Sequence, residues 1–277
     1  MPILKNGSDP NLGLVTIEST KFSLKNTCAF DSIFQILLAG VADHDEVKNC
    51  VQDNAHFNPL FEMITEAARS KIQSKTYRSR AEILLKFFKK TPKKNCIEEI
   101  FCQCNVVSLG NFLFSSTPSY QEISICPAGC PPRITSLPSI TITGKEIHLP
   151  LGRVIEDHIV IPGVSCKQTG CREEENNQIH EIGKIVMVGL DCDENMTIES
   201  IPKSFECPKT GQEYGFLGAV LYQGPTVMTR RISAIGHYVA LTKRGQKWTI
   251  YDDLHQKSTS VMKTVRVKPE LIFYFKK

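Results

Sequence analysis

The chain has 277 residues, of which 41% are hydrophobic and 22% are charged, a composition typical of one globular unit that buries a sizeable core without disulfides. Its formal net charge of +4 is too small to indicate a nucleic-acid-binding protein. No apolar run is long enough to cross a membrane and no signal peptide is recognisable, so we expect a cytoplasmic or nuclear protein that is not attached to membranes. No internal repeat is evident, and we expect a single domain over residues 1–277 that is monomeric.

The N-terminal part of the chain is predicted to be mainly helical. Residues before about Leu24 contain Gly7, Pro10 and Gly13 and are expected to form a loose arm or an initial strand. Apolar residues then recur at helical spacing, as in 60–64 and 83–88. The basic run 86–94 is interpreted as a solvated helix end and loop.

Cys28 stands at the predicted start of a buried helix. The run 32–39 is mostly apolar, Gly40 is expected to end the helix, and Asn26 or Thr27 could cap its first turn. Backbone N–H groups and the positive end of the helix dipole would stabilise a thiolate there, and the same N–H groups could bind an oxyanion. Cys28 therefore has the features of a catalytic nucleophile, although a lone cysteine that opens an apolar helix is usually a core residue.

Four cysteines in the middle of the chain form two close pairs. The pairs are Cys126 with Cys130 and Cys166 with Cys171. The total of eleven cysteines is odd and a reducing compartment is the default, so close pairs indicate a metal rather than disulfides. Four thiolates from two glycine-containing loops would give the closed tetrahedral shell of structural Zn²⁺, although free thiols explain the loose spacing equally well. Segments 139–143 and 154–161, between the pairs, are predicted strands.

Strand signals dominate the rest of the chain. The predicted strands cover residues 182–190, 216–222, 238–242, 248–251 and 271–275. Helices first and an antiparallel sheet later predict an α+β fold, with the active site in the cleft between the two halves.

His237 and Asp252 lie at opposite ends of a predicted hairpin. Its two strands meet in a turn at Gly245, so that a histidine at the start of one strand and an aspartate at the end of the next fall side by side. Asp252 could then hold the imidazole tautomer while His237 faces the thiol of Cys28. Each residue alone has an ordinary structural explanation, but all three in this order and local setting predict a cysteine protease.

These motifs resemble those of the ubiquitin-specific protease family, papain-like cysteine enzymes that cleave ubiquitin or its relatives from lysine side chains. The segment around Cys28 is similar to the family's cysteine box. Segment 214–224 is similar to the strand before the family's histidine box, and residues 236–252 are similar to the box itself. Segment 271–275 is similar to the family's closing strand, so the resemblance extends from about Phe22 to the C-terminus.

The resemblance implies a papain-like fold in three parts. A helical half at 22–110 carries the nucleophile, zinc-bound β fingers occupy 111–190, and a sheet half at 191–277 carries the catalytic histidine and aspartate. The zinc is expected to be structural and remote from the chemistry. The implied activity is that of a thiol-dependent isopeptidase, a deubiquitinase or SUMO isopeptidase. Such an enzyme hydrolyses the bond between the C-terminal glycine of ubiquitin, or a ubiquitin-like modifier, and a lysine amine. The roles of nucleophile, base and orienting carboxylate fall to Cys28, His237 and Asp252.

Several positions depart from the family's pattern. The family places an oxyanion-stabilising asparagine five residues before the nucleophile, where this chain has Ser23; Asn26 is an alternative donor. Asp31 replaces a family asparagine, as in the SUMO-directed branch. Asp253 is a candidate supporting group near the oxyanion or the modifier's tail. The family's glutamine-rich box is degenerate in its best candidate segment, 95–101.

Two other functional classes stay open. One is a pseudo-enzyme that binds ubiquitin or SUMO without cutting it, which Ser23 and the degenerate box favour and the intact Cys28, His237 and Asp252 oppose. The other is a zinc-containing adaptor, which would bind its partners through the region 126–171.

Overall fold

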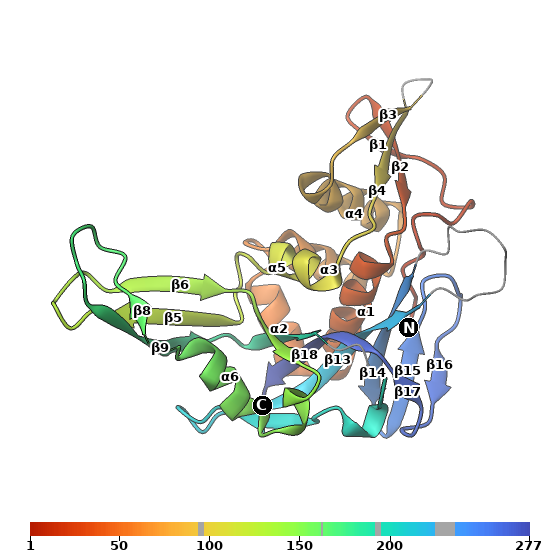
Figure 1. The fold of residues 1–277 in the computed structure, drawn as a ribbon. Coiled ribbons are helices and arrows are strands. Elements are labelled where there is room, and N and C mark those ends of the chain that lie inside the picture. The colour runs from red at the N-terminus through yellow and green to blue at the C-terminus, as the bar shows by residue number, and fades with distance from the viewer. Residues whose placement is uncertain (94–96, 162, 192–194, 225–235) are drawn as a thin grey trace.

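A central helix, α1, organises the N-terminal half of the protein (Figure 1). The computed structural model describes residues 1–277 except 94–96, 162, 192–194 and 225–235. Every residue of α1 from Cys28 to Val41 is buried, because the other helices cover one side and the main sheet covers the other. Within the described residues the helices of this half are α1 (Cys28–Asp43), α2 (Asp45–Asp53), α3 (Pro59–Ser70), α4 (Ser74–Phe87) and α5 (Val106–Leu113).

α1 continues past Gly40, where the sequence predicted its end. A Cβ atom at Gly40 would lie 2.7 Å from Leu217 Cδ1, a distance that real Cβ atoms do not show. The glycine is therefore a point of close approach between the helix and the sheet rather than a helix terminator.

A small sheet ties the N-terminal arm to the helices. The strands β1 (Val15–Ile17), β2 (Thr20–Lys25), β4 (Ile97–Phe101) and β3 (Thr91–Lys93) lie in this order, with β2 parallel to β4. The arm before β1 is not loose, because Leu4 is 0% exposed and Asn6 is 3% exposed. Leu4 joins the main hydrophobic core, which fixes the arm against the Cys28 end of α1.

The C-terminal half is one large sheet that lies against the helices (Figure 1). Its strand order is β16-β15-β14-β13-β18-β10-β7, with β12 paired to β13. Among the strand pairs that the described residues form in this sheet, only β10–β7 is parallel. The strands are β7 (Ser139–Thr143), β10 (Ile185–Asp191), β12 (Ser204–Glu206), β13 (Glu213–Gln223), β14 (His237–Arg244), β15 (Lys247–Tyr251), β16 (Thr259–Val261) and β18 (Pro269–Lys276).

Successive residues of the central strands pack into two different cores. Leu271 and Phe273 of β18 contact the helices, whereas Ile272 and Tyr274 contact a second cluster on the other face of the sheet. That second cluster includes the short pair β11 (Met196–Thr197) with β17 (Arg266–Val267) and the single-turn helices η1 (Glu146–His148) and η2 (Ile198–Ser200). None of the helices in the described part of the chain combines the length and the hydrophobicity needed to cross a membrane.

Four further strands form a ribbon that extends away from the main sheet (Figure 1). Their order is β6-β5-β9-β8, and their bounds are β5 (Tyr120–Ile125), β6 (Arg133–Leu137), β8 (Val164–Ser165) and β9 (Glu174–Ile182). We call this ribbon the fingers. The predicted strand 139–143 is confirmed as a strand but belongs to the main sheet, as β7.

The prediction of a strand at 154–161 is wrong. Most of this segment lies in helix α6 (Leu151–Ile159), followed by residues without regular structure. Its buried residues Leu151, Val154, Ile155 and Ile159 follow helical spacing and pack on the second core. The β-branched residues suggested a strand, but burial of one helix face outweighs that local preference.

Candidate active site and metal centre

Cys28 is the first residue of α1 and lies against the start of β14. Its side chain borders a small hollow with Asn26, Cys104 and Gly236, and the residue is 7% exposed. Burial raises the pKa of the Cys28 thiol from 9.0 to about 12, although hydrogen bonds from the backbone N–H groups of Tyr238 and Ala29 act in the opposite direction. The favourable helix end predicted from the sequence is therefore outweighed by burial, and the thiol is protonated at neutral pH.

His237 and Asp252 are brought together by the β14–β15 hairpin. His237 Nε2 lies 2.8 Å from Asp252 Oδ1, and the same oxygen accepts a hydrogen bond from the backbone N–H of Leu254 at 2.9 Å. Although burial opposes it, the hydrogen bonds from His237 and Leu254 hold the pKa of Asp252 below 3.8, so that its carboxylate is ionised. A carboxylate at Nε2 leaves Nδ1 available as the proton acceptor of the ring.

The thiol and the imidazole flank the same short stretch of backbone without a hydrogen bond between them. The thiol of Cys28 accepts from the N–H of Tyr238, the residue that follows His237. Among the described residues, the ring of His237 forms its hydrogen bond to Asp252 and lies 3.5 Å from Asp253 Oδ1. Cys28 and His237 are thus neighbours that are not engaged with each other in this conformation.

A buried ion pair lies one helical turn beyond Cys28. Arg80 Nη1 of α4 is 2.8 Å from Asp31 Oδ1, and each side chain is 1% exposed. The hydroxyl of Thr27 donates to Asp31 Oδ2 at 2.5 Å, so the residue before the helix binds a side chain rather than capping the helix backbone. Burial raises the pKa of the Asp31 carboxyl, and the positive charge of Arg80 opposes this effect.

Asp253 extends this network to the N-terminal arm. Asn6 Nδ2 donates to Asp253 Oδ2 at 2.7 Å, and the backbone N–H of Asn6 donates to the carbonyl of Asp253 at 3.1 Å. Burial and the neighbouring carboxylate of Asp31 raise the pKa of Asp253 to about 10. Asp253 is therefore protonated at neutral pH and lies beside the carboxylate of Asp31.

The two proposed oxyanion donors occupy different positions. Ser23 lies within β2, in register with Glu99 of β4, and within the described residues it forms no hydrogen bond to Cys28. Asn26 borders the hollow at Cys28, has a positive φ of 57°, and donates its backbone N–H to Ser8 Oγ at 3.0 Å. The geometry favours Asn26 over Ser23. Of segment 95–101, only residues from 97 onward lie within the described residues.

Sequence reasoning missed Asn6 and Arg80. Arg80 had a usable signal, because it precedes the buried residues Ile83 and Leu84 by three and four positions and so shares their helix face. A charged residue on an apolar face indicates a buried partner. Asn6 had no comparable signal, since its partner Asp253 is 247 positions away.

The four paired cysteines converge at the tip of the fingers. Their sulfur atoms all lie within 4.8 Å of one another, and Cys126 Sγ is 3.7 Å from Cys171 Sγ. Tetrahedral Zn²⁺ with Zn–S bonds of about 2.3 Å places its ligands about 3.8 Å apart, whereas a disulfide requires about 2.05 Å. Gly129 and Gly170 have positive φ values of 76° and 84°, which lets both loops turn around a common centre. The donor set and the spacing therefore fit a structural zinc ion.

No family model matches the chain, and no curated protein matches it. Solved structures match over nearly its whole length. The SAGA Ubp8–Sgf11–Sus1–Sgf73 DUB module shares 15% identity over 98% of this chain and 69% of that chain, with a TM-score of 0.55. A yeast SAGA DUB module with mutant Sgf73 shares 13% identity over 100% of this chain and 68% of that chain, with a TM-score of 0.50. The Saccharomyces cerevisiae PAN2 pseudoubiquitin-hydrolase shares 13% identity over 91% of this chain and 86% of that chain, with a TM-score of 0.55.

The likeness shows that this chain has the mixed α/β fold of ubiquitin-specific-protease domains. That fold occurs both in a DUB module and in a pseudoubiquitin-hydrolase. The residues of the site must therefore decide between catalysis and binding.

Proposed function

We propose that this chain is a thiol-dependent isopeptidase that hydrolyses the bond between the C-terminal glycine of ubiquitin, or a ubiquitin-like modifier, and a lysine amine. One observation carries the proposal: His237 Nε2 lies 2.8 Å from Asp252 Oδ1, and the next residue, Tyr238, donates its backbone N–H to the thiol of Cys28 at the start of a buried helix. A nucleophile, a base and an orienting carboxylate in this arrangement support acyl transfer.

The proposed reaction begins with activation of Cys28. Because the resting thiol is buried and protonated, its proton has to move to His237 Nδ1 when the modifier's tail enters the hollow. The thiolate attacks the glycine carbonyl, and His237 then protonates the departing lysine amine. Water hydrolyses the thioester. The N–H groups at the start of α1, together with Asn26, are the proposed donors to the oxyanion.

We further propose that Cys126, Cys130, Cys166 and Cys171 hold one structural Zn²⁺ ion. The ion would fix the two loops at the tip of the fingers and would take no part in the chemistry. Arg133 and Glu175, 2.8 Å apart between β6 and β9, support the base of this tip. We place the protein in the cytoplasm or nucleus as a monomer whose partners are the modifier and its conjugates.

Covalent capture tests the reaction and identifies the modifier. The protein is incubated separately with ubiquitin and with SUMO that carry a thiol-reactive group at the C-terminus, and the mass shift is read. We expect an adduct with one of them that is lost in Cys28→Ala. Cys104→Ala is the matched control, because Cys104 borders the same hollow and its loss should leave the adduct intact. An adduct that survives in Cys28→Ala would refute the assignment.

A binding-only function is the second candidate. The absence of a hydrogen bond between Cys28 and His237, two described residues, and the high pKa of the thiol favour it. It predicts measurable affinity for ubiquitin or SUMO with no adduct in the capture experiment. Affinity and adduct together would exclude it.

A further inference from the structure

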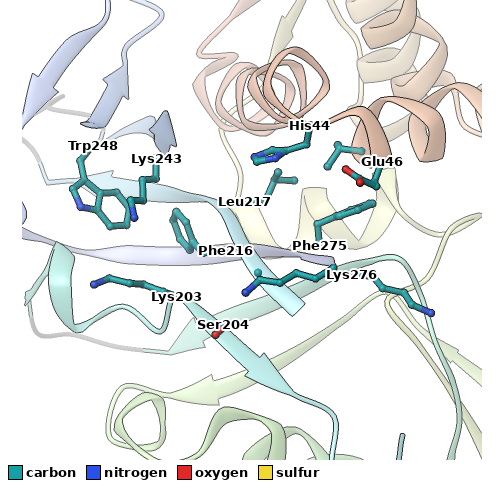
Figure 2. A pocket seen from close by; sticks show the side chains of 13 residues that line it. His44, Glu46, Lys203, Ser204, Phe216, Leu217, Lys243, Trp248, Phe275 and Lys276 are labelled. Atoms are coloured by element: carbon teal, nitrogen blue, oxygen red, sulfur yellow. The ribbon is translucent and has the colours of Figure 1, made fainter. Parts of the chain in front are cut away.

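A two-lobed groove lies at the far end of α1 from Cys28. The first lobe has a volume of about 540 Å³ and extends from His44, just after α1, to Trp248 of β15 (Figure 2). The second has a volume of about 670 Å³ and continues from Trp248 to the turn after β16. Both are lined by Lys203, Lys243 and Trp248, so they form one elongated surface feature. Each lobe falls in the size range of binding pockets.

The floor of the groove is apolar and is shaped by an irregularity in β13. The register of β13 against β18 shifts between Phe216 and Gly218, so that Leu217 is an extra residue and the strand bends. The ring of Phe216 lies edge-on to Trp248 with centroids 5.4 Å apart and an interplanar angle of 66°. Gly215, which also lines the first lobe, adds no side chain to fill it. The bend and the glycine leave an open pocket with an aromatic wall.

The rim of the groove is strongly basic. Within the described part of the chain, six lysines line the two lobes: Lys203, Lys243, Lys247, Lys263, Lys276 and Lys277. Two of them are neutralised, since Lys263 pairs with Glu199 and Lys277 pairs with Glu213. Among the described residues, the other four have no carboxylate within ion-pair distance. The one acidic residue among the described residues of the lining, Glu46, lies beside Phe275 and away from Lys203 and Lys243 (Figure 2).

We infer that this groove binds an acidic peptide segment of a partner protein, with an apolar side chain of the segment seated against Phe216 and Trp248. The charge of the rim demands an anionic occupant, and the two joined lobes suit an extended chain rather than a compact ligand. Carboxylates along the segment would pair with Lys203, Lys243, Lys247 and Lys276.

A peptide fits this groove better than a nucleic acid does. Stacking of bases requires an open aromatic face, but Trp248 is 6% exposed, with Phe216 against it and the Lys243 ammonium 6.0 Å from its ring centroid. Among the residues that the structure describes, arginine, the side chain best suited to bidentate phosphate contacts, lines neither lobe.

The groove is separate from the proposed reaction. α1 has 16 residues, which corresponds to about 24 Å between Cys28 and the groove at His44. The inference therefore goes beyond the proposed isopeptidase activity, and its test uses no turnover.

The only tryptophan of the chain, Trp248, reports on the groove directly. The wild-type protein is titrated with a synthetic peptide in which leucine and phenylalanine are embedded among glutamates, and the emission of Trp248 is recorded. We expect a saturable change that weakens as salt is raised, because exposed charge pairs are screened. Lys243→Gln or Lys203→Gln should weaken binding about two- to five-fold, and the double variant about ten-fold. Lys21→Gln, at an exposed position of β2, is the matched control and should bind as the wild type does.

Two further peptides separate the contribution of charge from that of apolar contact, and an oligonucleotide tests the class of ligand. A peptide with every glutamate replaced by lysine should not bind, and a peptide with its apolar residues replaced by serine should bind at least about ten-fold more weakly. A single-stranded oligonucleotide should compete poorly. The inference is overturned if the acidic peptide leaves Trp248 emission unchanged, if the lysine replacements have no effect, or if the oligonucleotide binds more tightly than the peptide.

Discussion

Arg80 Nη1 lies 2.8 Å from Asp31 Oδ1 in the interior of the protein. The same nitrogen is 2.7 Å from the carbonyl oxygen of Lys5 and 3.2 Å from the hydroxyl of Thr27. One guanidinium thus joins α4, the N-terminal arm and the first turn of α1. These are the elements that surround the nucleophile position, so the ion pair fixes the base of the site.

Replacing Arg80 with methionine should destabilise the protein strongly. Methionine keeps most of the side-chain length but leaves the carboxylate of Asp31 buried without its positive partner. Removal of one member of a buried pair costs about 3–5 kcal/mol, which would appear as a lower free energy of unfolding in urea.

A double replacement separates the charge effect from lost packing. Arg80→Met combined with Asp31→Leu removes both charges, and the double variant should be more stable than Arg80→Met alone. If the two single losses simply add, the buried charge is not the cause.

Asp253 should make the stability of the protein fall as the pH rises from about 4 to about 10. Its pKa is about 10 in the folded protein and about 4 in the unfolded chain. Between these values the folded state holds a proton that the unfolded state has released, so stability is fully present below about pH 4 and falls as the pH rises toward 10. The slope for one proton is at most about 1.4 kcal/mol per pH unit.

Asp253→Asn replaces the carboxyl with a side chain that cannot ionise. Between about pH 6 and about pH 9, the melting temperature of the wild type should therefore fall more steeply than that of the variant. Circular dichroism at both pH values provides the comparison. Parallel curves would mean that Asp253 does not carry the proton.

The parts of the fold that the sequence predicted correctly depend on local signals. α1 begins at Cys28, and the hairpin that carries His237 forms around Gly245, because apolar periodicity and turn residues determine both. The cysteine pairs also meet as expected, since a metal-type donor set is visible in spacing alone.

The parts that the sequence could not predict depend on distant contacts. Asn6 binds Asp253, which is 247 positions away in the sequence. Gly40 lies within its helix and leaves room for Leu217 of β13, which no sequence neighbour of Gly40 indicates. The high pKa of Cys28 has the same origin, since its burial follows from how β14 packs on α1. Neighbouring residues in the sequence were enough to predict a role for a side chain. Its burial and its hydrogen-bond partners were determined by tertiary packing.

Asp252→Asn should lower turnover without unfolding the protein. The asparagine can occupy the same space, but its uncharged side chain no longer stabilises the imidazolium that forms during the reaction. We expect kcat/KM for a fluorogenic modifier conjugate to fall by about 10²- to 10⁴-fold. Asp157→Asn, on the exposed face of α6, is the control and should retain full activity. Equal activity in both variants would show that Asp252 does not orient the base.

Zinc removal should loosen the fingers before it affects the helical half. The purified protein should contain about one zinc ion per chain, and Cys130→Ser should lose it because three thiolates no longer close the tetrahedral shell. Cys104→Ser, which alters a cysteine outside the cluster, should keep the metal. Metal content by mass spectrometry and hydrogen exchange along β5 and β9 measure the two effects. Exchange should rise in these strands on chelation, while amides of α1 stay protected by the main core. A metal-free protein with fully protected fingers would instead show that the four thiols are held by the strands alone.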